Sequence, residues 1–366
     1  MTAKYSIEVF YKMAEIVLKG VKKVYPSGNV GAKNVDLKIE NGEFVVICGG
    51  MGAGKSAVMR MICGLEDVTE GEILIDEVVV NDVQPKDRDV AAIMQNMPLY
   101  PHLTVAENIA YSLNLRKMPK AEVDARVKEA AEVTGVTGCL LKKPKNLSSL
   151  ERQRVLLARS VARRTKIIMA DEPFKGLDEG LKNEMRSEMV KLCAALGINF
   201  IVSTRSFVDA VVMADKIAYM ENGEIVQYGT PEELYNTPLT VNVASYFGRP
   251  KINIMDGRIE NGCFVGGGIT VPLGNNEQAK AYDGTDKKVY LAVRSEDISE
   301  GELFETDIES VGEAKSGNHA FSFTLGGVYH FTANGKNSFT ANTRAGVGFN
   351  LERVLLYDFD TEKLIV

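Results

Sequence analysis

The chain has 366 residues, of which 45% are hydrophobic and 25% charged, a balance typical of a soluble globular protein with one large and one smaller domain or two comparable ones. Its net charge of −6 argues against nucleic acid as the main partner, and no apolar run approaches the ~18–20 residues of a transmembrane helix. The five cysteines contain no CxxC pair and the three histidines have unrelated spacing, so we expect reduced thiols in a cytosol, no zinc site and no signal peptide.

The start of the chain allows two interpretations. Strand-like sequence begins near Met13, so residues 1–12 are either an extension upstream of the true start or a genuine N-terminal arm. Both alternatives stay open, including whether residues 1–12 are translated.

Short apolar runs rich in β-branched residues follow, and each is bounded by turn-forming residues. Helical segments lie between several of these runs, and this alternation predicts an α/β core with a mostly parallel sheet. Asn222 and Gly223 predict a tight hairpin turn, because both tolerate a positive φ angle. The expected strands are residues 43–48, 71–80, 165–173 and 198–206, followed by a helix at 207–215 and a hairpin at 216–229.

Residues 96–164 have a helical pattern, and the texture changes again after about Gly248. There, short strands alternate with glycine turns, which is typical of a small all-β domain. We therefore predict a first domain at 13–245, with a helical subdomain at about 96–164, and a C-terminal domain at 246–366. Within the helical part, one face of an amphipathic helix is expected to collect Val123, Val127, Ala130 and Ala131.

A glycine-rich motif follows the first of these strands. Residues 49–56, GGMGAGKS, match GxxxxGK[ST] between a predicted strand and a predicted helix, the context that this phosphate-binding motif requires. Its glycines let backbone N–H groups face phosphate oxygens, and the helix N-terminus adds partial positive charge. Lys55 is expected to reach the β- and γ-phosphates, and the Ser56 hydroxyl to ligate Mg²⁺.

An acidic pair ends the strand at 165–173. Asp171 and Glu172 follow four apolar residues, at the carboxyl end of a core strand, where α/β sheets bind ligands. Asp171 is expected to hold Mg²⁺, largely through water, and Glu172 is the candidate general base for an attacking water. The structural alternative is an acidic strand end that caps the next helix.

Four further segments occur in a distinctive order with these motifs. Together they closely resemble, over nearly the whole chain, the ATPase subunit of bacterial ABC importers in the maltose, multiple-sugar and glycerol-phosphate branch. The resemblance implies a P-loop NTPase core of α/β class with a helical subdomain, and a C-terminal all-β barrel of OB-like character. The segments are RDVAAIMQNMPLYPHLTVAENIAYSL (88–113), ERQRVLLARSVARR (151–164), DEPFKGLD (171–178) and GEIVQYGTPEELYNTP (223–238), with AVRSEDI (292–298) similar to the RPE segment of that branch.

The resemblance also implies roles by position. Tyr25 matches the aromatic residue that stacks on adenine, Gln95 the glutamine that senses Mg²⁺ and the permease, and Asp178 the D-loop aspartate. Ser148 matches the signature serine, which contacts the ATP of the partner subunit. The remaining ATP-binding set is Gly49, Gly50, Met51, Gly52, Ala53, Gly54, Lys55, Ser56 and Ala57, and the Mg²⁺ set is Ser56, Gln95 and Asp171.

The signature loop departs from the family pattern. Where the family has LSGGQ, residues 147–151 read LSSLE. We expect Ser149 and Leu150 to add bulk where glycines allow close approach, and Glu151 to bring negative charge toward the partner's γ-phosphate.

The switch histidine is also replaced, because its position falls on Arg205. Arginine can still donate to phosphate, or it can pair with Glu172 and disable that residue as a base. Lys175 takes a D-loop serine position, and Ala57 replaces a hydroxyl residue next to Ser56.

The resemblance implies a head-to-tail dimer at the cytoplasmic face of the cell membrane. Its partners are transmembrane permease subunits and, indirectly, an extracellular solute-binding protein. The leading hypothesis is an ATPase that couples ATP binding and hydrolysis to uptake of a carbohydrate or related solute. The alternative is a weakly hydrolysing or non-hydrolysing regulatory subunit paired with a regular paralogue, and homodimer and heterodimer both stay open. The sequence does not reveal the solute or a ligand of the C-terminal domain.

Overall fold

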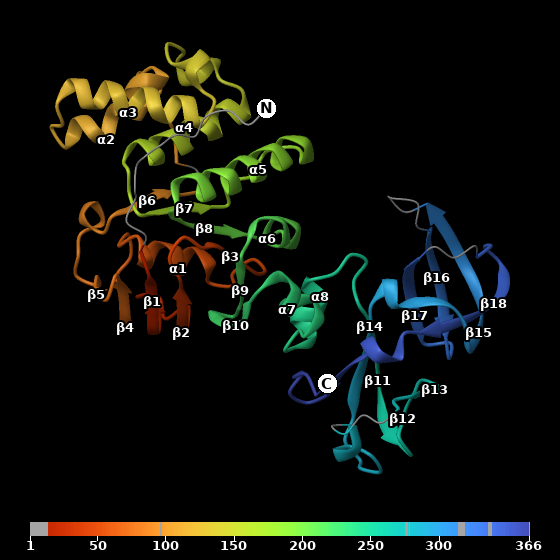
Figure 1. Cartoon of the computed structure of the whole chain (residues 1–366). Coiled ribbons are helices and arrows are strands. Elements are labelled where there is room, and N and C mark those ends of the chain that lie inside the picture. The colour runs from red at the N-terminus through yellow and green to blue at the C-terminus, as the bar shows by residue number, and fades with distance from the viewer. Residues whose placement is uncertain are drawn as a thin grey trace. The chain divides into compact units, whose positions relative to one another are not determined.

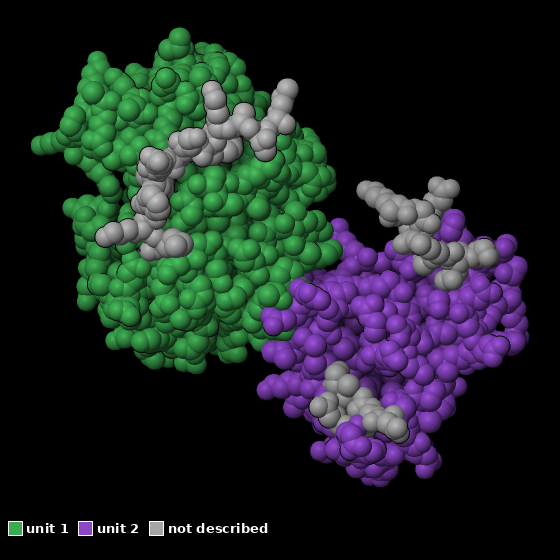
Figure 2. Space-filling view, viewed as in Figure 1, with its two compact units in different colours: residues 1–231 green, residues 232–366 purple. Residues whose placement is uncertain are grey.

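The computed structural model describes residues 14–95, 97–274, 277, 279–313, 319–335 and 339–365. The chain forms two compact units, residues 1–231 and residues 232–366 (Figure 2). Because the description begins at residue 14, both interpretations of residues 1–12 lie outside the described residues. The domain boundary between residues 245 and 246 stays a prediction.

A six-stranded sheet forms the core of the first unit, in the order β10-β9-β3-β8-β7-β6 (Figure 1). Neighbouring strands from β9 to β6 pair in parallel, and β10 pairs with β9 antiparallel. Every residue of β3 and β7 is buried, as expected for strands covered on both faces. The predicted parallel core is confirmed, with strands β3 (Phe44–Cys48), β6 (Val90–Ile93), β7 (Ile167–Asp171), β8 (Asn199–Thr204), β9 (Lys216–Glu221) and β10 (Glu224–Gly229).

A second sheet of the first unit is antiparallel, in the order β2-β1-β4-β5. Its strands are β1 (Ile16–Val24), β2 (Val30–Ile39), β4 (Glu70–Ile75) and β5 (Val78–Val79). The expected single strand at 71–80 is instead a hairpin, because Asp76 and Glu77 adopt positive φ angles of 50° and 64° between β4 and β5.

The helices of the first unit fall into two groups. In Figure 1, α2, α3 and α4 lie together at one end of the unit, whereas α1, α5 and α6 lie beside the six-stranded sheet. The predicted apolar face of α3 is confirmed by the burial of Val123, Val127, Ala130 and Ala131. The bounds are α1 (Lys55–Ile62), α2 (Val105–Leu115), α3 (Lys120–Val133), α4 (Ser149–Ala162), α5 (Glu179–Leu196) and α6 (Phe207–Met213), with short 3-10 turns at Pro85–Asp87, Thr137–Cys139 and Pro144–Asn146.

The second unit is dominated by antiparallel strands, as predicted for the C-terminal domain. One sheet has the order β13-β12-β11-β14-β19 and the other β17-β16-β15-β18, and a shared apolar core joins them. The closer likeness to an OB fold stays a prediction. The elements are α7 (Pro231–Asn236), α8 (Val241–Tyr246), β11 (Asn253–Glu260), β12 (Cys263–Gly266), β13 (Ile269–Pro272), β14 (Val289–Val293), β15 (Ile298–Glu313), β16 (His319–Leu325), β17 (Tyr329–Gly335), β18 (Thr343–Phe349) and β19 (Leu355–Asp358), with 3-10 turns at Ala279–Ala281, Ser295–Asp297 and Leu351–Arg353. In the part of the chain that the structure describes, no helix is both long and apolar enough to span a bilayer.

Candidate nucleotide site

The glycine-rich loop 49–56 connects the carboxyl end of β3 to α1. Gly49 and Gly54 have φ angles of 145° and 101°, which side chains rarely adopt. A Cβ atom at Gly49 would lie 2.1 Å from the Met220 carbonyl oxygen, and one at Gly54 would lie 2.4 Å from the Gly31 carbonyl oxygen. Both positions therefore require glycine for the loop to keep this path.

The turn between β9 and β10 braces this loop from the side. Its Gly223 amide donates to the Ala53 carbonyl oxygen at 3.0 Å, and its own carbonyl oxygen accepts from the Lys33 amide at 2.7 Å. Asn222 and Gly223 have φ angles of 50° and 85°, so the predicted tight turn is confirmed.

The Lys55 side chain lies inside the loop and is 7% exposed. Its Nζ donates to the carbonyl oxygens of Gly49 at 2.8 Å and Gly50 at 2.7 Å. Burial lowers the pKa of this ammonium, and the negative charge of Glu172 opposes the shift. The Gly49 and Gly50 carbonyl dipoles only partly balance the positive charge of Lys55, and a phosphate bound in the loop would balance it fully.

Asp171 ends β7 and is 3% exposed. Its Oδ1 accepts from the Ser56 hydroxyl at 3.3 Å and from the Ser203 hydroxyl. Across the described residues, no group of three or more His, Cys, Asp or Glu side chains surrounds a common point. Hard oxygen donors at Ser56 and Asp171 fit a Mg²⁺ ion that takes its other ligands from phosphate and water.

Glu172 follows β7 with a φ angle of 51°, an uncommon backbone conformation for a non-glycine residue. Its amide donates to the Ser203 carbonyl oxygen at 3.1 Å and the Ser203 hydroxyl at 3.2 Å, which holds it in place. Arg205 Nε donates to Glu172 Oε1 at 3.0 Å, and the two side chains are 49% and 16% exposed. Two roles were considered for Arg205, donation to phosphate and pairing with Glu172, and the structure shows the ion pair with Glu172.

The loop that carries Arg205 rests on a buried ion pair that the sequence did not reveal. Arg186 Nε, on α5, donates to Asp209 Oδ1 at 2.8 Å, and both side chains are almost fully buried. Asp209 Oδ2 accepts from the Thr204 hydroxyl at 2.7 Å, directly before Arg205. The available signal was a charged residue on the apolar face of α5, but the sequence names no partner for it.

A cavity of ≈ 430 Å³ opens beside the two acids. It brings Gln95 together with Asp171 and Glu172, although 76 or more positions separate them along the chain. Lys175, at the family's serine position, also lines it. Gln95 is exposed at this edge, where a ligand could meet it.

Tyr25 lies near the start of α1 rather than inside the loop. A Cβ atom at Gly31 would contact both the Tyr25 ring, at 2.7 Å, and Ala57 Cβ, at 3.1 Å. The Tyr25 hydroxyl donates to Glu66 Oε2 at 2.8 Å, and Lys23 Nζ lies 5.5 Å from the ring centroid. Adenine stacking on Tyr25 therefore stays a prediction.

The signature segment forms the N-terminus of α4, with Ser148 as its N-cap. The Ser148 amide donates to Glu151 Oε2 at 2.7 Å, and the Glu151 amide donates to Ser148 Oγ at 3.2 Å, a complete capping box. Glu151 Oε1 also accepts from Cys139 Sγ at 2.9 Å and Lys142 Nζ at 3.0 Å. Together the Cys139 thiol, the Ser148 amide and the Lys142 ammonium lower the pKa of Glu151 to about 2.

One expectation for this segment is corrected, the position of Leu150, and the effect of the Glu151 charge on a partner's phosphate stays a prediction. The Glu151 carboxylate is bonded within its own chain, where it accepts from the Ser148 amide of the capping box. Leu150 is 9% exposed, so its bulk packs inward, whereas Ser148 and Ser149 are exposed at the helix start.

Two other expected residues lie at exposed ends of elements. Asp178 is the N-cap of α5 and accepts from the Leu181 amide at 3.0 Å. Met51 is 89% exposed at the tip of the loop. Their contacts with nucleotide stay predictions.

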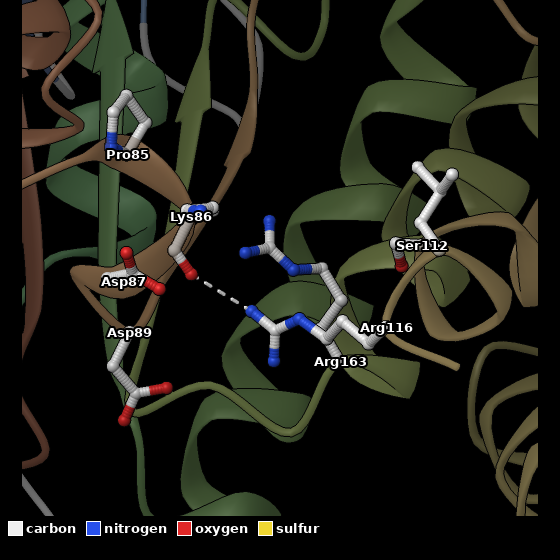
Figure 3. Close-up of a pocket in the computed structure, with 8 residues that line it drawn as sticks. Pro85, Lys86, Asp87, Asp89, Ser112, Arg116 and Arg163 are labelled. Atoms are coloured by element: carbon white, nitrogen blue, oxygen red, sulfur yellow. Dashed lines mark hydrogen bonds between the residues drawn. The ribbon is translucent and has the colours of Figure 1, made fainter. Parts of the chain in front are cut away.

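A larger cavity of ≈ 810 Å³ lies elsewhere in the first unit (Figure 3). Arg116 Nη2 donates to the Lys86 carbonyl oxygen at 3.1 Å, and Figure 3 shows the Arg163 guanidinium between the same segment and Ser112. Burial lowers the pKa of Arg163, and the nearby charge of Arg116 adds to this effect. Among the described residues, Arg163 Nε and Ser112 Oγ are buried without a hydrogen-bond partner. The other lining residues are Pro85, Asp87, Asp89 and Leu115.

Comparison with known proteins agrees with this geometry. Residues 32–175 match the ABC transporter family. Over 96% of its length, the chain is 36% identical to the whole of the multiple sugar-binding transport ATP-binding protein MsmK of Streptococcus mutans. It is 40% identical over 78% of its length to the oligosaccharides import ATP-binding protein MsmX of Bacillus subtilis, of which it covers 79%.

The relatives also include the sn-glycerol-3-phosphate import ATP-binding protein UgpC of Rhodopseudomonas palustris, 44% identical over 66% of this chain and 67% of that protein. Among solved structures, a dimeric bacterial ABC transporter cassette is 32% identical, with a TM-score of 0.54 over 59% of this chain and 98% of that one. The phosphate loop, the acidic pair and these likenesses lead to one conclusion: the chain belongs to the ABC transporter family, as an ATP-binding ATPase subunit.

Proposed function

We propose that this ATPase subunit powers the import of a carbohydrate or related solute through partner permeases. One observation carries the proposal: Lys55 lies inside a glycine loop, with Ser56 3.3 Å from Asp171 at its base. Relatives named for sugar, oligosaccharide and glycerol-phosphate import support the solute class.

Mg²⁺ is the proposed cofactor beside ATP. Ser56 and Asp171 would hold it, with Gln95 at the edge of the neighbouring cavity. When bound, the ion neutralises charge on the β- and γ-phosphates. The chain's own contribution is to fix these oxygen donors through Ser203, which bonds both Asp171 and the Glu172 amide.

We place each ATP between two subunits in a head-to-tail dimer. The loop of one subunit would hold the phosphates, and the exposed Ser148 at the start of α4 in the other would approach the γ-phosphate. Glu172 would accept a proton from the attacking water, because its backbone is held at the end of β7.

A second candidate function is a slowly hydrolysing regulatory subunit paired with a regular paralogue. The Arg205–Glu172 ion pair favours it, since the Arg205 guanidinium occupies a carboxylate oxygen that would otherwise be free to accept from the attacking water. The two candidates share the nucleotide site and differ in turnover.

For the permease, we propose docking at the cavity of Figure 3. Leu115 is 68% exposed and offers apolar contact, while Arg116 and Arg163 line the cavity with positive charge for a carboxylate of a permease segment. The subunit would then lie at the cytoplasmic face of the membrane, with the extracellular solute-binding protein reached only through the permease. An Arg163→Glu variant should keep ATP binding and lose co-purification with permease-containing membranes. Retained co-purification would contradict the docking site.

The main proposal is tested with the purified chain, alone and with a regular paralogue. Equilibrium dialysis should show Mg²⁺-dependent ATP binding, and coupled phosphate release should show turnover that Glu172→Gln removes. Turnover that is insensitive to Glu172→Gln in both settings would favour the regulatory candidate. Absence of Mg²⁺-dependent ATP binding would end both.

A further inference from the structure

The second unit contains a cavity of ≈ 530 Å³ that the nucleotide site does not use. Its walls come from the end of α7, the turn Ser295–Asp297, the turn Leu351–Arg353 and the start of β19. The volume lies in the range of small-molecule sites. Val354, Leu355 and Leu364 give the cavity an apolar part.

Asp297 is the unusual residue of this cavity. Its side chain is 6% exposed, and its Oδ1 lies 3.2 Å from Arg353 Nη1. Its Oδ2 is buried and has no hydrogen-bond partner among the residues that the structure describes. A buried carboxylate oxygen is costly to leave unpaired, so a bound donor would be stabilising here.

The backbone around Asp297 is held from both sides. Its amide donates to the Arg294 carbonyl oxygen at 3.1 Å, and its carbonyl oxygen accepts from the Asn350 amide at 2.8 Å. The side chain therefore cannot find a partner through a small backbone movement without breaking these bonds.

The cavity wall beside Asp297 is also fixed. The Arg294 guanidinium lies 3.6 Å from the centroid of the Tyr235 ring and donates to the Phe247 carbonyl oxygen at 2.8 Å. It donates to the Tyr235 carbonyl oxygen as well, and the Tyr235 hydroxyl donates to Glu296. This wall is preorganised, which lowers the entropic cost of binding a ligand.

The charges of the lining select the ligand class. Arg294 and Arg353 balance Asp297 and Glu352, so neither an anion nor a cation meets a field of one sign. A neutral molecule with neighbouring hydroxyls fits better, because one hydroxyl can donate to the Asp297 carboxylate while the next accepts from the exposed side of Arg353. We propose that this cavity binds a small neutral polyol, of the size of a mono- or disaccharide. The site lies outside the nucleotide site and does not depend on the proposed import function.

The test is isothermal titration of the full-length chain, without nucleotide, against three kinds of probe. Glucose, maltose and sucrose are the neutral polyols, sn-glycerol 3-phosphate is the anion, and putrescine is the cation. At least one neutral sugar should bind, and neither charged probe should bind more tightly. No neutral binding, or tighter binding of the anion or the cation, would overturn the proposal.

Variants locate the site. Asp297→Asn should weaken sugar binding by ~10-fold, as expected for the loss of a charge-assisted hydrogen bond. Asp286→Asn is the matched control, because Asp286 is a fully exposed carboxylate of the same unit, outside the cavity lining. Unchanged affinity in Asp297→Asn would place the sugar elsewhere and refute the site.

Two further variants guard against misfolding of Asp297→Asn and separate this site from the nucleotide site. If Asp297→Asn fails to fold by circular dichroism, Arg353→Gln takes its place, since this half-exposed side chain can be shortened at the cavity rim. Its sugar affinity should also fall by several-fold, and an unchanged value would refute the site. Lys55→Ala should keep the sugar affinity of the unchanged chain, so a failure of nucleotide binding and a failure of this proposal are seen separately.

Discussion

The starts of α1 and α4 are both placed to meet phosphate in the proposed dimer, but they treat their free N–H groups differently. At α1, the N-cap is Gly54, no side chain bonds the first amides, and the first turn has no acid. At α4, Ser148 and Glu151 bond each other's amides. An amide that already holds a carboxylate must lose that bond before it can hold a phosphate. The comparison separates a helix start without a side-chain cap from one whose Ser148 and Glu151 amides are already bonded within a capping box.

The largest expected effect concerns the glycine-rich loop at the uncapped start of α1. Lys55→Ala should lower the affinity for Mg·ATP by at least ~100-fold, because it removes charge-assisted hydrogen bonds to phosphate. Equilibrium dialysis with labelled ATP measures it, and Lys182→Ala, a partly exposed lysine of α5, is the control. Equal affinity in both variants would show that the loop does not hold the nucleotide.

Glu172→Gln comes next and leaves binding intact. Turnover should fall by ~10²–10⁴-fold, the usual contribution of a general base, while ATP affinity stays within a few-fold. Phosphate release measures it, with Glu184→Gln as the control, since Glu184 is an exposed acid of α5 that pairs with Arg154. A fall of similar size in both variants would point to lost folding instead.

Arg205→His tests whether the Arg205–Glu172 ion pair limits hydrolysis. The change removes the 3.0 Å contact between Arg205 Nε and Glu172 Oε1, so turnover should rise by roughly 10-fold if the ion pair restrains the base. Arg205→Gln should also release Glu172 but supply no imidazole. A drop in turnover in both variants would instead assign Arg205 to phosphate binding.

The smallest effect concerns the capping box at the start of α4. Glu151→Ala should destabilise the protein by about 1 kcal/mol at neutral pH, because it removes the capping acceptor, whereas Glu151→Gln keeps that acceptor without the charge. The pKa of Glu151 is lowered to about 2 from 4.5, so the stability due to its charge is present above pH 4.5 and disappears as the pH falls toward 2. Urea unfolding from pH 6 downward should bring the unchanged chain and Glu151→Gln together, and parallel curves would contradict the pairing.

Local motifs made much of this architecture predictable. The loop 49–56 and the turn at Asn222 depend on residues a few positions apart, and their glycines and φ angles agree with the structure. The hairpin at Asp76 and Glu77 was missed: Asp is a common turn residue, but this Asp-Glu pair lacks the glycine of a typical two-residue turn and lies within a run of apolar, largely β-branched residues.

Long-range pairs were harder to predict. The sequence offered the Arg205–Glu172 pair as one of two alternatives, since the two residues are 33 positions apart. It gave no reason to join Arg186 to Asp209, and it did not reveal the partners of Glu151, because Cys139 and Lys142 approach that carboxylate only in the folded helical group. Partners of charged residues depend on the fold, whereas backbone turns depend on local sequence.

The Gly223 turn has one more consequence. It grips the nucleotide loop through Ala53, and the strand that leaves it, β10, is the last strand of the first unit before the chain passes through α7 into the second. If the loop shifts when nucleotide binds, this hydrogen bond would move the β9–β10 hairpin with it. The hydrogen bond that holds the phosphate loop therefore also fixes the turn from which β10 leads toward α7.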